Sequence, residues 1–438
     1  MATQAAARCI QHQPYGELEP DNPVMSEDCL YLNVWTPDIS SSVALPVIFW
    51  IHGGEFFAGS GTEPRYNGAR LAARGAVIVT INHRLNVFGF LSHPELCSES
   101  GRRTSGNFGL LDQIAALNWV RDNISAFGGD PGCVTIAGES AGSCSVSALM
   151  ASPLAENLFH RALGESCAYF MPEPHAMKPL PHEESVDRGV RFMRAAGASS
   201  LAELRSMTGR QLLGVWQKKP AERFQPCFDN DTLRDVDTVF ALGQQARVPL
   251  LAGWNGEEMG FLRATRAKFD ADAFSESVKG AFGDAAGSLL SAYHSDDALQ
   301  SAVALSSDRS MVYPTWKWAE RHARHAPVFV YQFDRNPPGS PFGPTHACEI
   351  EYVFGTLDSK PRDYLREDRE LSERMGDYWV NFARAGDPNG ENLPKWQAYA
   401  PNKAVHYLDT LMSSKPLAIS SRLELLDGIY KAKASKKD

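Results

Sequence analysis

A serine between two glycines is the feature that most constrains this chain. The run TIAGESAG (135–142) joins an apolar, β-branched segment to an alanine-rich segment that favours a helix. Gly-x-Ser-x-Gly in this context predicts a strand, a strained tight turn and a helix, because both glycine positions pass too close to neighbouring backbone for a Cβ. Such a turn exposes the hydroxyl of Ser140 at a helix N-terminus, where developing negative charge is favoured.

The composition is that of a globular enzyme with a large core. Of the 438 residues, 43% are hydrophobic and 22% are charged, and the formal net charge is −9. Basic residues form no block except in the tail at 431–437, so nucleic acid is not expected as a partner. A neutral or weakly polar small molecule fits this charge better. No apolar stretch approaches the roughly 20 residues that span a membrane.

Motifs for metal or nucleotide binding are missing from the sequence. The eight cysteines form no Cys-x-x-Cys pair, and there is no His-Glu-x-x-His, phosphate-loop or Gly-x-Gly-x-x-Gly pattern. We therefore expect no metal and no cofactor. The first residues, Met1–Gln4, do not resemble a signal peptide, so a cytoplasmic location is expected for the sequence as it stands. Secretion stays open for a longer N-terminus, and the sequence does not predict the oligomeric state.

The order of apolar and amphipathic segments predicts an α/β protein. Continuous apolar runs are typical of strands buried on both faces of a sheet, and amphipathic segments lie between them. The predicted strands are Leu45–Ile51, Ala76–Ile81, Val134–Ala137, Val248–Gly253 and Val328–Phe333, and the predicted helices are Asn107–Ser125, Ser140–Ala151 and Ser372–Ala385, the last capped by Ser372. We expect a mainly parallel central sheet flanked by helices. It would form one domain over residues 1–438, with a helical cap insertion at about 173–243.

A glycine turn upstream of the serine offers the groups that an oxyanion hole needs. Gly53-Gly54-Glu55 closely follows the strand predicted over Leu45–Ile51. The main-chain N–H groups of this turn, together with that of Ala141, can surround the oxygen of a tetrahedral intermediate. The alternative is an ordinary Gly-Gly turn, which the serine turn downstream makes the weaker interpretation.

The general base is expected late in the chain, because a triad on this architecture runs serine, acid, histidine. His346 lies in the loop PFGPTH after the strand Val328–Phe333, where a base can lean over the serine. His322 and His325 lie in the charged segment KWAERHARH and are expected to be solvated, and His406 is expected to pack within a strand. His346 is therefore the predicted base.

Two adjacent carboxylates compete for the role of the acid. Glu257 and Glu258 both follow the strand Val248–Gly253. Either could hold the imidazole tautomer and stabilise the imidazolium that forms when Ser140 loses its proton. Adjacent residues of an extended loop point in roughly opposite directions, so only one of them can reach His346. These residues alone do not decide which.

With these residues in place, the chain resembles the type-B carboxylesterases, the α/β-hydrolase family that includes cholinesterases and bacterial p-nitrobenzyl esterases. Similar segments follow one another along nearly the whole chain: SEDCLYLNVW (26–35), NHRL (82–85), FGGDP (127–131), GESAG (138–142), GPTHACEI (343–350) and FARAGDP (382–388). The resemblance implies an α/β-hydrolase fold and a serine carboxylesterase that needs no cofactor.

The resemblance also implies roles for single residues. It implies a catalytic triad of Ser140, Glu258 and His346, with Glu258 as the acid of the family's Gly-x-Asn-x-x-Glu pattern. Glu257 is then expected to face solvent or the cap. Its oxyanion donors would be the amides of this glycine turn and of the residue after the serine. Glu139 and Ser166 would lie around the triad, with Ser166 supporting the acid.

Four further positions are compared with the family pattern. Glu27 resembles the family's buried structural acid, and Cys9 and Cys29 resemble its first disulfide pair. Glu55 stands where the family has a small residue, which puts a carboxylate near the nucleophile. The family pattern also includes several dozen residues ahead of Cys9, and these are expected to be missing from this sequence.

The expected activity is hydrolysis of carboxylic esters to acid and alcohol through an acyl-enzyme. A second interpretation is a specialised hydrolase of carbamates, diesters or toxin esters that uses the same triad, and the sequence does not separate these substrates. A different class is a non-catalytic binding protein like the neuroligins. The presence of Ser140, Glu258 and His346 together argues against that class.

Overall fold

The central feature of the fold is one large, mostly parallel sheet. A computed structural model describes residues 4–12, 24–39, 43–173, 175–218, 222–265, 270–294 and 296–435. Within these ranges the sheet has nine strands in the order β13-β12-β11-β10-β7-β6-β4-β5-β3. Only β3 against β5 and β13 against β12 pair antiparallel among the described strands of this sheet. The strands are β3 (Leu32–Trp35), β4 (Leu45–Ile51), β5 (Val77–Ile81), β6 (Gly129–Glu139), β7 (Arg161–Glu165), β10 (Leu250–Asn255), β11 (Val328–Phe333), β12 (Ala404–Leu408) and β13 (Ser413–Pro416).

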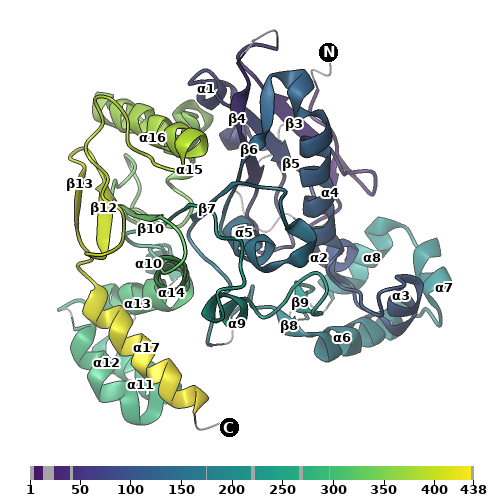
Figure 1. Cartoon of the computed structure of the whole chain (residues 1–438). Coiled ribbons are helices and arrows are strands. Elements are labelled where there is room, and N and C mark those ends of the chain that lie inside the picture. The colour runs from purple at the N-terminus through teal and green to yellow at the C-terminus, as the bar shows by residue number, and fades with distance from the viewer. Residues whose placement is uncertain are drawn as a thin grey trace.

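Helices cover both faces of this sheet, as expected (Figure 1). In chain order they are α1 (Ala69–Ala72), α2 (Asn86–Phe90), α3 (Pro94–Glu99), α4 (Phe108–Asn123), α5 (Ala141–Ala151), α6 (His182–Ala195), α7 (Leu201–Ser206), α8 (Gly209–Gln217), α9 (Val236–Ala241), α10 (Leu262–Thr265), α11 (Ala271–Phe282), α12 (Ala286–Ala292), α13 (Ala298–Ser307), α14 (Tyr313–His322), α15 (Ile350–Phe354), α16 (Arg366–Ala385) and α17 (Ser420–Ala434).

Strand β4 illustrates why the apolar runs are continuous. Phe49 and Ile51 pack into the core formed with α4, α5 and α14. Ile48 and Trp50 pack into a second core, formed with α1, α15 and α16. Successive side chains of a strand point to opposite faces, so a strand covered by helices on both sides must be apolar at every position.

The predicted strand bounds are confirmed best where the sequence is most apolar. Leu45–Ile51 and Val328–Phe333 are strands over those residues. The strand predicted at Val134–Ala137 is longer, because β6 already pairs with β4 at Gly129. The strand predicted at Val248–Gly253 is shifted, because β10 runs on to Asn255, and Asn255 is paired with β11.

The predicted start of helix α16 is wrong. The helix begins at Arg366, and Ser372 is buried inside it, where its Oγ donates to the carbonyl of Tyr352 at 2.7 Å. The first turn is instead stabilised by Asp368, whose Oδ2 accepts the N–H of Leu365 at 2.8 Å. A carboxylate in the first turn satisfies a free amide and opposes the positive end of the helix dipole.

Two helical groups are inserted between strands of the sheet. The segment predicted as a cap, 173–243, contains α6 to α9 and the short paired strands β8 (Leu180–Pro181) and β9 (Cys227–Phe228), and in Figure 1 α6, α7 and α8 lie together beside α2 and α3. The second group, α10 to α14, lies between β10 and β11 in the chain and was not predicted as an insertion. Lys433 of α17 donates to the carbonyl of Ala281 in α11 at 3.3 Å, so the C-terminal helix packs on this group.

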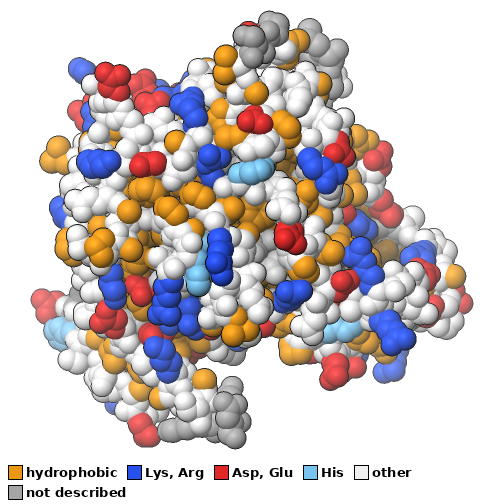
Figure 2. All heavy atoms as spheres, viewed as in Figure 1, with side chains coloured by type: hydrophobic (Ala, Val, Ile, Leu, Met, Phe, Trp, Pro, Cys, Tyr) orange, Lys and Arg blue, Asp and Glu red, His pale blue; other side chains and the backbone are white. Residues whose placement is uncertain are grey.

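Charged side chains of both signs are spread over the face drawn in Figure 2, and hydrophobic side chains gather near its middle. Among the described helices, none is long and apolar enough to cross a membrane. Residues 1–3 and 436–438, parts of the N-terminal stretch and basic tail considered above, lie outside the described residues.

Candidate active site

Ser140 occupies a strained turn between β6 and α5. Its backbone has φ 55° and ψ −118°, a conformation that non-glycine residues rarely adopt. A Cβ added to Gly138 would lie 2.6 Å from the carbonyl carbon of Gly142, and one added to Gly142 would lie 2.0 Å from the carbonyl oxygen of Ile51. Both glycines are therefore required by the close passage of backbone, as the motif predicted, and the turn lifts Ser140 to the end of the sheet.

Side chains from two later loops meet this serine. His346, in the loop after β11, has Nε2 at 3.0 Å from Ser140 Oγ. Its Nδ1–H donates to Oε2 of Glu258, which follows β10, at 2.7 Å. The parallel strands β6, β10 and β11 end at the same edge of the sheet, which brings together residues far apart in sequence.

The contact to His346 also distinguishes the two adjacent glutamates. Glu258 is fully buried and faces the imidazole. The Glu257 carboxylate instead accepts two hydrogen bonds from Arg263, at 2.8 and 2.9 Å, and one from Gln300 at 3.1 Å. Glu258 contacts His346 as expected, whereas Glu257, which was expected to face solvent or the cap, contacts Arg263 and Gln300 of the second helical group.

The second carboxylate oxygen of Glu258 also accepts hydrogen bonds. Oε1 accepts the hydroxyl of Ser166 at 2.6 Å and the backbone N–H of Asn255 at 2.8 Å. Two donors on one buried carboxylate oxygen fix its orientation. The other oxygen is thereby aligned with the ring of His346.

Asn255 and Glu349 are two polar residues whose place in the site sequence reasoning missed. The side-chain amide of Asn255 donates to the carbonyl of Thr345 at 2.9 Å and to Oε2 of Glu349 at 2.5 Å. It therefore fixes the loop that carries His346 against β10. The signal was present in the Gly-x-Asn-x-x-Glu pattern and in the glutamate three positions after His346, but nothing in the sequence joins those two segments.

Glu139 adds a second carboxylate beside the imidazole. Its Oε1 lies 3.2 Å from Nε2 of His346. Burial raises the pKa of Glu139 to about 7, and burial with the nearby charges of Glu139 and Glu258 raises the pKa of Glu349 to about 8. Burial alone lowers the pKa of His346, but the carboxylates of Glu139 and Glu258 outweigh burial, and the net pKa is raised.

The glycine turn expected to form an oxyanion hole lies against the nucleophile. A Cβ on Gly53 would lie 2.6 Å from Oε2 of Glu139 and 3.2 Å from Cβ of Ser140, so the turn passes close to the nucleophile. Gly54, Glu55 and Phe56 have φ values of 107°, 53° and 64°, three consecutive left-handed residues. Ala141 is the first residue of α5, and the first amides of a helix have no partner within the helix.

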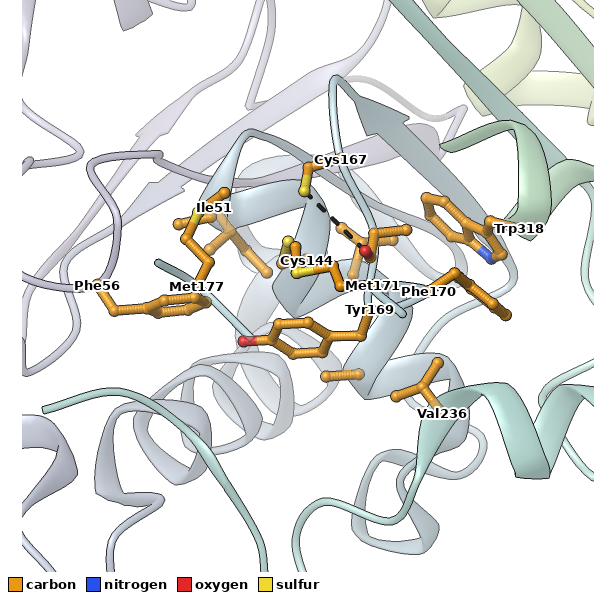
Figure 3. Close-up of a cluster of buried hydrophobic side chains, with 14 of the residues drawn as sticks. Ile51, Phe56, Cys144, Cys167, Tyr169, Phe170, Met171, Met177, Val236 and Trp318 are labelled. Atoms are coloured by element: carbon orange, nitrogen blue, oxygen red, sulfur yellow. Dashed lines mark hydrogen bonds between the residues drawn. The ribbon is translucent and has the colours of Figure 1, made fainter. Parts of the chain in front are cut away.

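A segment of the predicted cap covers the serine. The sulfur of Met177 lies 4.0 Å from Oγ of Ser140, and only 4% of Ser140 is exposed. In Figure 3, Met177 lies over the ring of Phe56, with Tyr169 beside them, in the apolar cluster next to α5. The two aromatic rings are 6.3 Å apart between centroids and nearly parallel.

A cavity of about 260 Å³ opens between this segment and the second helical group. Arg309 in its wall donates to Glu173 through Nε at 2.8 Å, so the polar side of the cavity is an ion pair. Burial lowers the pKa of His175 to about 4, so this imidazole is neutral near pH 7. The lining residues include Met171, Glu173, His175, Met259, Leu262 and Arg309.

Other sequence expectations are corrected by the structure. His322 is not solvated: it is fully buried, Nε2–H donates to the carbonyl of Val248 at 2.7 Å, and burial lowers its pKa to about 4. The charged residues around it in sequence face other directions on α14. His325 is half-buried rather than solvated. His406 packs in β12 as expected, stacked on Trp396 with ring centroids 4.7 Å apart.

Two features implied by the family resemblance also differ. Glu27 is exposed rather than buried, and its Oε1 accepts the N–H of Gly209 at 3.2 Å. Cys9 and Cys29 are buried next to each other, as the resemblance implies, and both are free thiols; the sequence had left their oxidation open. Among the described residues, no group of three or more His, Cys, Asp or Glu side chains has the arrangement of a metal site.

The sequence matches the model of a family described as the carboxylesterase family over residues 1–422. The chain belongs to the carboxylesterase family. It is 38% identical over 398 residues to the para-nitrobenzyl esterase of Bacillus subtilis (strain 168), covering 86% of this chain and 78% of that protein. It is 34% identical to the fumonisin B1 esterase of Sphingopyxis macrogoltabida, covering 85% and 71% of the two chains.

A solved structure, that of a thermophilic PNB esterase, is similar over 96% of this chain and 88% of that chain, with a TM-score of 0.83 and 34% identity. This carboxylesterase therefore has the α/β-hydrolase fold that the sequence predicted. It is a serine carboxylic-ester hydrolase, and its substrates are small-molecule esters.

Proposed function

We propose that Ser140, His346 and Glu258 are the catalytic triad of this carboxylesterase and that hydrolysis passes through an acyl-enzyme. The observation that carries the proposal is the chain of contacts in which Nε2 of His346 lies 3.0 Å from Ser140 Oγ and Nδ1 lies 2.7 Å from Glu258 Oε2. A nucleophile hydrogen-bonded to a base, itself oriented by an acid, is the arrangement that activates a serine.

In the acylation step, Oγ of Ser140 attacks the ester carbonyl carbon while Nε2 of His346 takes its proton. The tetrahedral adduct then breaks its bond to the alkoxy oxygen, which leaves as the alcohol with the proton from the imidazolium. In deacylation, water gives a proton to His346 and its oxygen adds to the acyl carbon, and the acid leaves as the proton returns to Oγ. Glu258 holds the tautomer and stabilises the imidazolium in both steps.

The negative oxygen of each adduct needs donors that are already in place. We assign this role to the main-chain amides of Gly54, Glu55 and Ala141, with Gly53 next to them. Support comes from the close approach of Gly53 to Ser140 and from the position of Ala141 at the start of α5. Donors fixed before the reaction need no reorganisation as charge develops, which lowers the barrier.

We further propose that the chain is one catalytic domain with a cap formed by 173–243. Two contacts support the assignment of a cap: Met177 lies over Ser140, and Arg223 forms an ion pair with Glu55. A cap of this kind shields the reacting groups from bulk solvent and shapes the substrate pocket.

The pocket supports a small ester with an apolar acyl or alcohol group as the substrate. Met171, Met259 and Leu262 line the cavity of about 260 Å³, which is the size of a small organic group. A specialised substrate, such as a carbamate, a diester or a toxin ester, is the second candidate. The similarity to a fumonisin B1 esterase supports keeping toxin esters in this class of candidates.

A panel of p-nitrophenyl esters of increasing chain length, run with and without an organophosphate, tests the proposal. We expect turnover of short and medium acyl chains, complete loss after organophosphate treatment, and one labelled serine, Ser140. Adding a carbamate, a diester and a toxin ester separates the two substrate classes by kcat/KM. Turnover that survives complete labelling of Ser140 would contradict the proposed mechanism.

A further inference from the structure

The glycine turn and the cap are joined by one ion pair. Nη1 of Arg223 donates to Oε2 of Glu55, and the guanidinium carbon also lies over the ring of Phe57, 5.0 Å from its centroid. These side chains remain 36% (Arg223) and 29% (Glu55) exposed. One cap residue therefore contacts two positions of the same loop, on either side of Phe56.

The loop needs support because of its backbone. Gly54, Glu55 and Phe56 all have positive φ, and for the last two this conformation is unfavourable. Such a backbone persists only where surrounding contacts fix it. The carbonyl of Gly54 accepts the amide of Phe57, in the same loop, at 3.1 Å. The carbonyl of Phe56 accepts the amide of Asn86, in α2, at 2.7 Å. Arg223 adds a contact from outside the loop.

Arg223 is itself fixed to the cap helices. Its carbonyl accepts Nη1 of Arg188, from α6, at 2.8 Å. The carbonyl of its neighbour Glu222 accepts Nε1 of Trp216, from α8, at 3.1 Å. The position of the guanidinium is thus set by α6 and α8.

The pair also lies near the reacting groups. The charges of Glu55, Arg223 and His346 all act on the imidazole of His175, which lines the substrate cavity. Glu55 is thus close to the site as well as being one of the residues whose amide is assigned to the oxyanion hole.

We propose that the Glu55–Arg223 ion pair is a positioning contact that holds the oxyanion loop in its reactive conformation. Neither side chain reacts with substrate. This inference rests on the proposed role of the Gly54 and Glu55 amides. An ion pair with this exposure contributes little to global stability. Its removal should therefore affect the transition state more than the fold.

The test compares Glu55→Gln and Arg223→Gln with the wild-type enzyme. We expect kcat on p-nitrophenyl butyrate to fall about tenfold, less than the loss of a complete oxyanion donor, while KM changes less than about twofold. The affinity for a trifluoromethyl ketone, which forms a tetrahedral adduct with the serine, should fall in parallel with kcat/KM. The double variant should be no worse than either single variant, because both remove the same contact.

Arg191→Gln is the matched control. Arg191 forms an ion pair with Glu222 at 3.2 Å, next to Arg223 on the same cap, but does not reach the loop. It should keep wild-type kcat and inhibitor affinity. Arg223→Lys, which retains the charge, should recover part of the lost kcat.

The inference is wrong if Glu55→Gln and Arg223→Gln keep wild-type kcat and ketone affinity. It is equally wrong if all three variants, Arg191→Gln included, lose kcat together with a large drop in melting temperature. That pattern would indicate general damage to the cap. Labelling by a fluorophosphonate separates this failure from failure of the proposed triad. All these variants should still be labelled at Ser140, whereas labelling at another serine would refute the triad itself.

Discussion

Oε1 of Glu139 lies 3.2 Å from Nε2 of His346, and the same nitrogen lies 3.0 Å from Oγ of Ser140. A carboxylate next to the reacting nitrogen favours the imidazolium, which cannot accept a proton from serine. Against the effect of burial, which lowers it, the carboxylates of Glu139 and Glu258 raise the pKa of His346 to about 10. The identity of residue 139 therefore controls the pH at which the base becomes available.

This contact predicts the pH dependence of the enzyme. The neutral imidazole accumulates only as pH rises through a raised pKa, so kcat/KM should still increase above the ordinary histidine value of about 6.5. Glu139→Gln removes the negative charge and lowers the pKa of His346, so the acidic limb should move to lower pH by about one pH unit or more. pH–rate profiles measure both effects, with Glu257→Gln as the control. An acidic limb of kcat/KM at the same pH in Glu139→Gln and in the wild-type enzyme would contradict this prediction.

Ser140→Ala should abolish ester turnover and labelling by fluorophosphonates. The expected loss in kcat is on the order of 10⁴–10⁶, because the triad residues act as a unit. Circular dichroism and thermal melting should show an intact fold, since the change removes only a hydroxyl. Persistent labelling mapped to another serine would disprove the assignment.

Glu258→Gln and Glu257→Gln should differ strongly. Glu258→Gln loses the charge that orients His346 at 2.7 Å, and kcat should fall by roughly 10⁴. Glu257→Gln weakens contacts to Arg263 and Gln300 only, and kcat should fall less than about tenfold. Steady-state kinetics of both purified variants provide the measurement, and the reverse ranking would overturn the choice of acid.

Ser166→Ala should lower kcat by between about tenfold and a hundredfold, because a hydrogen bond to a buried charged group is lost. The bond removed is the one from Oγ to Oε1 of Glu258 at 2.6 Å. Ser147→Ala is the matched control, since Ser147 is also buried and donates to the Cys144 carbonyl at 2.7 Å, but does not contact the acid. Equal losses in the two variants would indicate a general effect on packing.

Gly142→Ala should destabilise the protein by about 3 kcal/mol or more, because its Cβ would meet the carbonyl oxygen of Ile51 at 2.0 Å. Gly214→Ala on α8 is the matched control: apart from its chain neighbours and its own helix, no heavy atom of the described residues lies within 4 Å of its Cβ position. This second change should stabilise the protein by about 0.5–1 kcal/mol through helix propensity. Chemical denaturation gives both free energies of unfolding, and a neutral Gly142→Ala would show that the turn can relax.

The features predicted best are those that depend on neighbours in the chain. The turn around Ser140 has a five-residue signature, although Gly142 also avoids the carbonyl of Ile51 on β4. The bounds of β4 and β11 follow from continuous apolar runs. Burial on both faces produces such runs whatever covers the sheet. The family's pattern selected Glu258 over Glu257, a choice that the residues alone had left open.

The features missed depend on partners far away in the sequence. His322 has charged neighbours in sequence, but its ring lies 5.7 Å from that of Phe240 and is buried. The partner of Arg223 is also distant: its guanidinium donates to the carboxylate of Glu55, which lies 168 positions away in the sequence. Periodicity reports which side of an element is apolar, but not which element will cover it.

By itself, the sequence determined a parallel α/β fold, the nucleophile turn and the kinds of group that could act beside it, because those depend on local backbone sterics and on the polarity of each segment. The tertiary structure decided which carboxylates surround His346, what covers Ser140 and what supports the left-handed turn at Glu55. These depend on the meeting of loops and insertions at one edge of the sheet, where packing of distant segments sets each distance and each local charge.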